Sequence, residues 1–263
     1  MDRLYEQRSF ETYRRAFYVT LLGVAGIAAL YFVGQGLGFM FRMVSDSLLE
    51  FLSLLLFLSA FSLARRYRWE WKGLIPRFWV AASFSAMFLF TAISVWNIRN
   101  YIGGGIFPHW LLAAALLLLS FSTAIYALTL YVGAFREALK GRVALIAYSS
   151  VLITGMAVAA FIVYPIILSN VALYEKLLMA VVALQEYTIL ALAILGVGIF
   201  LGGSFARAWL VFSLGITLLM AGSLLLFHWA LAGAYHSIYL GNMCVASGLA
   251  LTALSFHIHR REI

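Results

Sequence analysis

The acidic residue Glu186 lies deep inside a long apolar stretch of the sequence, residues 177–202. Nine residues separate it from the start of that stretch, which is about 14 Å in a helix that rises about 1.5 Å per residue. In a membrane this depth is near the middle of an apolar core about 30 Å thick, where an acidic side chain costs on the order of 2.5–3.5 kcal/mol. We therefore expect a neutral, hydrogen-bonded Glu186 that faces other helices. It would be either a structural acid that joins two helices or a proton, ion or quinol site.

Hydroxyl groups on other apolar stretches are the expected partners of Glu186, because no other acidic or basic residue lies at a comparable depth. Gln185 and Thr188 flank Glu186 and extend its polar character. The sequence thus predicts a small polar pocket inside the protein. The candidate partners are Tyr126, Thr129, Thr154 and Thr217.

A second group of titratable residues lies near the ends of apolar stretches that would share one side of a membrane: Asp46, Glu50, His109, His228 and His236. The short connection between His228 and His236 places both imidazoles at a similar level. A zinc site needs at least one further donor, for which His109, Asp46 and Glu50 are candidates by depth alone. The alternative interpretation is that the histidines are wetted by lipid headgroups.

These residues are positioned by a chain that is almost entirely apolar. Of its 263 residues, 65% are hydrophobic and 11% are charged, and the mean hydropathy is +1.00; soluble domains are about 25% charged. The composition predicts an all-α, polytopic transmembrane bundle forming a single domain over 1–263, with no soluble domain. The expected spans are 17–41, 48–64, 77–97, 107–134, 143–169, 177–202, 208–231 and 237–256.

The stretch 48–64 is the weakest of these spans. Its 17 residues are near the lower limit for crossing a core about 30 Å thick, and Glu50 lies at its start. A re-entrant or interfacial helix is the alternative, which would leave seven spans.

Glycines concentrate in the stretch 17–41 and at the end of 177–202, where they predict close helix packing.

Charge distribution predicts the orientation of the spans. Fifteen of the 18 Lys and Arg residues lie in the terminal segments and alternate connections that share the side of residue 1. Because basic connections stay in the cytoplasm, we expect a multi-pass protein of the cell membrane with both termini cytoplasmic. The asymmetry also supports 48–64 as a span. Residues 1–16 are expected to form a cytoplasmic interfacial segment, with arginines that reach lipid phosphates.

Known catalytic and nucleotide-binding patterns are missing from the sequence: Walker A, GxGxxG, GxSxG, HExxH and CxxC motifs do not occur. The net charge of +8 is explained by the basic connections, so a nucleic-acid partner is not supported. We expect a subunit without its own catalytic centre that serves transport or translocation in the lipid bilayer, together with partner membrane or cytoplasmic chains. The alternative is a membrane anchor of a redox complex that binds haem b or quinol. The sequence leaves the cofactor unknown.

Overall fold

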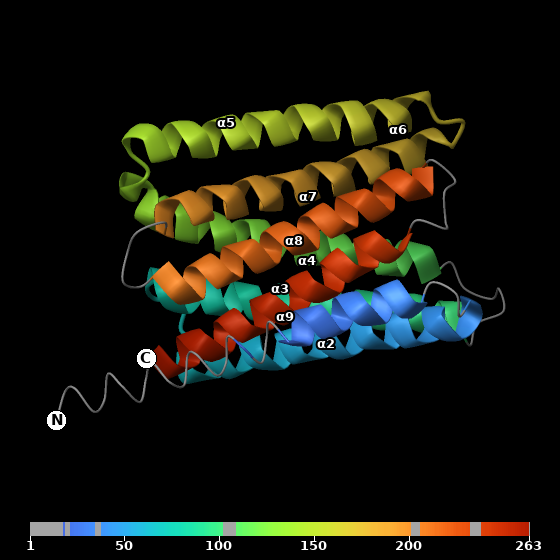
Figure 1. Ribbon diagram of the computed structural model, residues 1–263. Coiled ribbons are helices and arrows are strands. Elements are labelled where there is room, and N and C mark those ends of the chain that lie inside the picture. Colours follow the sequence, from blue (N-terminus) through green and yellow to red (C-terminus); the bar gives the residue numbers. More distant parts are fainter. Residues whose placement is uncertain are drawn as a thin grey trace.

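The computed structural model describes residue 18 and residues 22–34, 38–101, 109–200, 206–231 and 238–262. This part of the chain is helical and contains no strand, which confirms the predicted all-α bundle (Figure 1). Seven of its helical segments are long and apolar enough to cross a membrane. They are built from α2 (Gly38–Arg66), α3 (Leu74–Tyr101), α4 (His109–Phe135), α5 (Gly141–Val158) with η3 (Ala159–Val163) and α6 (Tyr164–Leu168), α7 (Leu173–Phe200), α8 (Ala206–Leu231) and α9 (Ile238–Glu262).

The doubtful stretch 48–64 forms part of α2, whose apolar segment Met43–Arg66 has 24 residues. That length is about 36 Å at about 1.5 Å per residue, so this helix is long enough to cross the membrane, and the short length that suggested a re-entrant helix does not apply to it. The first expected span, 17–41, has different bounds. Its described apolar helix, Leu22–Val33, is short, and residues 38–41 belong to α2. The predicted interfacial segment 1–16 lies outside the described residues.

Six of the helices form a closed ring in contact order. Going round it, α2 packs on α3, α3 on α4, α4 on α7, α7 on α8, α8 on α9, and α9 again on α2. The segment formed by α5, η3 and α6 lies outside this ring against α7, at the edge of the bundle far from α2 (Figure 1). The exposure of this segment fits its outer position. In the most apolar part of Gly141–Leu168, 17% is buried, compared with 50% in the corresponding part of α9.

Helices α8 and α9 approach each other through glycines. Gly215 and Gly222 on α8 face Gly248 and Gly241 on α9. A Cβ atom on Gly248 would lie 2.4 Å from the backbone nitrogen of Leu219, and one on Gly222 would lie 2.7 Å from the carbonyl oxygen of Gly241. Side chains larger than hydrogen therefore cannot occupy these positions unless the two backbones separate.

The connection between α2 and α3 marks one end of the bundle, which we call the basic end; the other is the opposite end. Just beyond the end of α2, Arg68 and Trp69 lie in the left-handed region, at φ of 53° and 56°. The backbone N–H of Trp69 donates to the carbonyl oxygen of Ala64 at 3.1 Å, and its ring lies 5.1 Å from that of Phe61. This closure uses a backbone conformation that usually favours glycine, and it turns the chain into α3.

Candidate functional site

Three consecutive residues in the middle of α7 reach three different helices. Gln185 Nε2 donates to Ser122 Oγ on α4 at 2.9 Å. Glu186 Oε1 accepts a hydrogen bond from Ser223 Oγ on α8. Tyr187 Oη donates to the carbonyl oxygen of Val151 on α5 at 3.2 Å. Because successive residues of a helix point in directions about 100° apart, one short polar segment contacts every long helix that packs on α7.

Glu186 is buried, with 3% of the residue exposed. Only one of its oxygens is satisfied: Oε1 accepts from Ser223, whereas Oε2 is buried and has no hydrogen-bond partner among the described residues. No cationic side chain in the described part of the chain forms a salt bridge with it. A buried carboxylate with a single neutral donor is unfavourable in its charged form. The geometry therefore agrees with the expectation that Glu186 faces the bundle.

The hydroxyls expected to bind Glu186 are engaged elsewhere. Thr154 donates to Ser150 O and Thr217 to Ser213 O within their own helices, and the Tyr126 and Thr129 side chains are exposed. The observed partner, Ser223, lies at a similar depth. Ser223 lies eight residues from the end of the stretch 208–231, and Glu186 lies nine from the corresponding end of 177–202.

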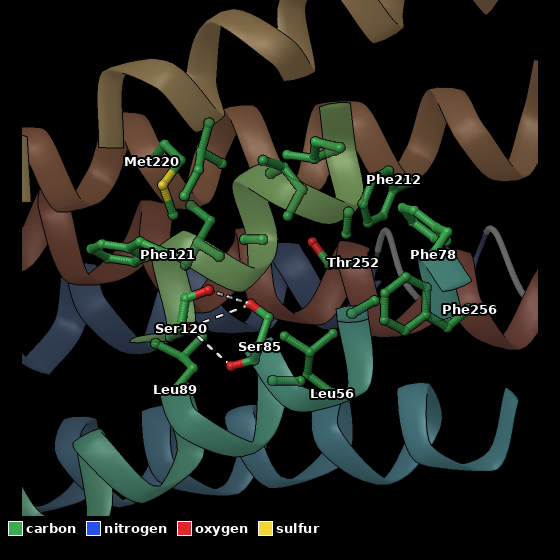
Figure 2. Close-up of a pocket in the computed structure, with 18 residues that line it drawn as sticks. Leu56, Phe78, Ser85, Leu89, Ser120, Phe121, Phe212, Met220, Thr252 and Phe256 are labelled. Carbon is green, nitrogen blue, oxygen red and sulfur yellow. Dashed lines mark hydrogen bonds between the residues drawn. The ribbon is translucent and has the colours of Figure 1, made fainter. Parts of the chain in front are cut away.

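A cavity lies inside the ring of helices (Figure 2). Its volume is about 60 Å³, and it is lined by α2, α3, α4, α7, α8 and α9. Ile189 on α7 and Met220 on α8 belong to its wall. They lie one helical turn from Glu186 and Ser223, respectively. The hydrogen-bonded pair of Glu186 and Ser223 is therefore next to the cavity, on the side that faces the opposite end of the bundle.

The cavity wall is almost entirely apolar. Its polar side chains are Ser85, Ser120 and Thr252. Ser85 Oγ donates to Ser120 O and Ser120 Oγ to Ser85 O, each at 2.9 Å (Figure 2). Thr252 Oγ1 donates to Gly248 O at 2.7 Å. All three hydroxyl protons are thus used within the protein, and none is offered to a polar ligand in the cavity.

Two of the other predicted residues, Asp46 and Glu50, join α2 to α3. Ser94 Oγ donates to Glu50 Oε1 at 2.7 Å, and Asn97 Nδ2 donates to Glu50 Oε2 at 3.0 Å. The same amide lies 3.2 Å from the backbone oxygen of Asp46. Sequence reasoning missed both partners on α3. Asn97 ends the stretch 77–97 at the level where 48–64 begins, so depth was again the available signal.

His228 lies at a different place. Its Nδ1 is 2.7 Å from the carbonyl oxygen of Phe161 in η3, and its ring packs edge-on against the Phe161 ring. Because η3 and α2 lie at opposite edges of the bundle (Figure 1), the described members of the predicted outer cluster occupy two separate places. The His109 side chain and all of His236 lie outside the described residues.

The described side chains offer little to a metal or haem. No group of three or more His, Cys, Asp or Glu residues in this part of the chain could hold a metal ion. His257 and His259 are on α9 near the basic end, where the His259 ring packs 4.9 Å from Trp79, whereas His228 is near the opposite end. No two described imidazoles therefore face each other at one depth, as paired axial ligands would.

The described cavity is also small, at about 60 Å³, whereas pockets that hold drug-sized ligands are roughly 300–1,000 Å³. What the arrangement can do chemically is to accept and release a proton at Glu186, whose second oxygen is uncommitted.

The chain matches no known protein family model, no curated protein and no solved structure.

Proposed function

We propose that this chain is a membrane-embedded subunit that serves transport or translocation together with partner chains, with Glu186 as its functional intramembrane acid. The observation that carries the proposal is the half-satisfied carboxyl group of Glu186 inside the bundle. A residue that only joined two helices would be stabilised by pairing both of its oxygens. Gln185 and Tyr187 already tie α7 to α4 and α5 with neutral groups.

The orientation in the cell membrane belongs to the same proposal. Exposed arginines and lysines at the basic end, including Arg65, Arg68 and Lys72, support a cytoplasmic location for that end by the positive-inside rule. A cytoplasmic basic end would also place partner chains that supply energy next to the connections of the bundle. No catalytic or nucleotide-binding motif in the sequence would supply that energy within this chain.

The experiment compares Glu186→Gln with the wild type in inside-out membrane vesicles from the native host, where partner chains are present. Ion flux under an imposed membrane potential is followed with a pH-sensitive dye and a sodium-sensitive dye. We expect the variant to lose the flux that depends on this chain while its melting temperature in detergent stays close to that of the wild type, because an amide keeps the hydrogen bond but does not titrate. Ser122→Ala, which removes the partner of the neighbouring Gln185, is the matched control and keeps the flux.

Two results would contradict the proposal. If Glu186→Gln transports as well as the wild type, the acid only joins helices. If the purified protein shows a Soret band that dithionite reduces, the redox-anchor alternative is favoured, although the described histidines do not pair.

A further inference from the structure

We propose that the ligand handled at Glu186 is a proton and not a metal cation. This inference rests on the proposed function, because it names what the same site carries. Three features of the described residues support it: the number of oxygen atoms at the carboxyl group, the positions of the charged groups around α7, and the enclosure of the α7–α8 contact.

Among the described residues, the Ser223 hydroxyl is the single hydrogen-bond partner of the Glu186 carboxyl group, so few side-chain oxygens are available there to a cation. Hard cations such as calcium and magnesium take about six or more oxygen ligands. At this site the structure places the two Glu186 oxygens and the Ser223 hydroxyl. Thr188, half a turn further along α7, donates its hydroxyl to Leu184 O at 2.7 Å, and Gln185 is held towards Ser122 on α4. A proton needs only one of the carboxyl oxygens.

Charged groups on the neighbouring elements do not compensate a carboxylate at this depth. On α7 itself, Glu175 and Lys176 lie at the opposite end, and the Tyr187 hydroxyl donates to Val151. The tyrosines of α4, α5 and α6 either have exposed side chains or, as with Tyr131, pack in the aromatic cluster near the basic end. The remaining titratable side chains described on elements that pack on α7 lie at helix ends: Arg136, Glu137, Arg142 and His228.

The enclosure of the site sets how the proton must move. Glu186 on α7 is buried where α7 packs on α8. The hydroxyl groups that line the adjacent cavity donate their protons to carbonyl groups of the protein. A cavity with an otherwise apolar wall that offers no hydroxyl donor to water does not favour an ordered water chain. Exchange of the proton therefore requires α7 and α8 to separate near Ser223, so that water reaches Oε2. The occupied state is the closed bundle with a neutral carboxyl group.

Chemical labelling with dicyclohexylcarbodiimide tests the inference on the full-length protein in lipid nanodiscs. This apolar reagent reacts with a protonated carboxyl group: the O–H adds across one C=N bond, and the resulting O-acylisourea rearranges to a stable N-acylurea with no other reactant consumed. Peptide mass spectrometry then reads the modification at Glu186 and, as an internal comparison, at Glu175. We expect labelling at Glu186 to fall as pH rises and to be unchanged by sodium, potassium, calcium or magnesium ions.

Two variants sharpen the readout. In Ser223→Ala the only described donor to the carboxylate is gone, so labelling at Glu186 should persist to higher pH than in the wild type. Ser122→Ala, which removes the hydrogen-bond partner of Gln185 only, should follow the wild-type profile. If Ser223→Ala does not fold, the wild-type dependence on pH and on ions still decides the question.

Infrared spectroscopy covers the case in which the reagent cannot reach the site. A protonated Glu186 contributes a carboxylic C=O band that is absent in Glu186→Gln, whatever the access of the reagent. Protection by any of the four cations, or a Glu186 that is ionised at neutral pH in the infrared spectrum, would overturn the inference. If Glu186 is protonated but the vesicles show no ion flux that depends on this chain, this inference stands and the proposed transport function fails. The two failures are therefore distinguishable.

Discussion

A single carbonyl group links Pro165 to His228. Proline has no backbone N–H, so the carbonyl oxygen four residues earlier, that of Phe161, lacks its usual helical donor. The segment Ala159–Val163 responds by adopting π-helical geometry, a form found mostly as short bulges in α-helices. His228 on α8 lies 2.7 Å from this oxygen, with its Nδ1–H as the donor. The histidine is thus a structural contact that ties α8 to the helix outside the ring.

We predict that His228→Ala lowers the free energy of unfolding by about 0.5–1.5 kcal/mol, because it removes one hydrogen bond to a backbone carbonyl group. Denaturant unfolding in mild detergent measures the change. Pro165→Ala is the control, since it restores an N–H at the residue that normally donates to Phe161. In that background His228→Ala should cost clearly less; an equal cost in both backgrounds would show that the hydrogen bond is not what His228 contributes.

Depth along a span was predictable from the sequence, and the direction in which a residue points was not. The depth of Glu186 is readable by counting, and the same count places Ser223 close to its level. However, whether α7 borders α8, α4 or another helix depends on the order of the ring, which no local pattern encodes. For the same reason Asp46 and Glu50 were candidates to lie beside His228 by depth alone, whereas the His228 bond is to Phe161 on a helix far from α2.

At the scale of elements, the close contact of α8 and α9 depends on glycines spaced seven residues apart on each helix: Gly215 and Gly222, and Gly241 and Gly248. The sequence-based expectation named the glycines at the end of 177–202, where a Cβ atom on Gly196 would lie 2.7 Å from Ser213 Oγ, and also the glycines of the stretch 17–41. Of those, Gly23 and Gly26 have no atom within 4 Å of the position that a Cβ methyl group would occupy. A glycine matters for packing only where another backbone faces it, and antiparallel spacing shared by two distant helices is visible only once they are known to be neighbours.

We predict that Gly248→Ala destabilises the protein by about 1–3 kcal/mol, the range for overpacking a well-packed interior. The added methyl group would meet the backbone nitrogen of Leu219 at 2.4 Å, and a backbone cannot move aside as a side chain can. Gly133→Ala on α4 is the matched control, because nothing lies within 4 Å of its Cβ position; its melting temperature should be unchanged or higher. Equal effects of the two substitutions would remove close packing as the cause.

At the scale of the whole molecule, the predicted orientation is the feature that the proposed function most needs. We expect a membrane-impermeant maleimide added outside intact cells to label cysteines placed at Gly104 and Gly233, and to leave cysteines placed at Trp69 and Leu139 unlabelled. The Cys244→Ser background removes the native thiol. Labelling at Trp69 from outside would reverse the orientation, and with it the side of the membrane on which partner chains contact the basic end.

The closed ring also has a consequence for how the protein is made. Helix α9 has the lowest mean hydropathy of the seven segments that are long enough to span a membrane, 1.3. It is also the most buried of them, with 50% of its most apolar part inside the protein. It leaves the ribosome after α2 and α8, yet it is the helix that contacts both. A span of such modest hydropathy partitions weakly from the translocon into lipid by itself. The integration of α9 is therefore expected to depend on α2 and α8, which are already in the membrane. The ring of helices closes only when α9 has been inserted.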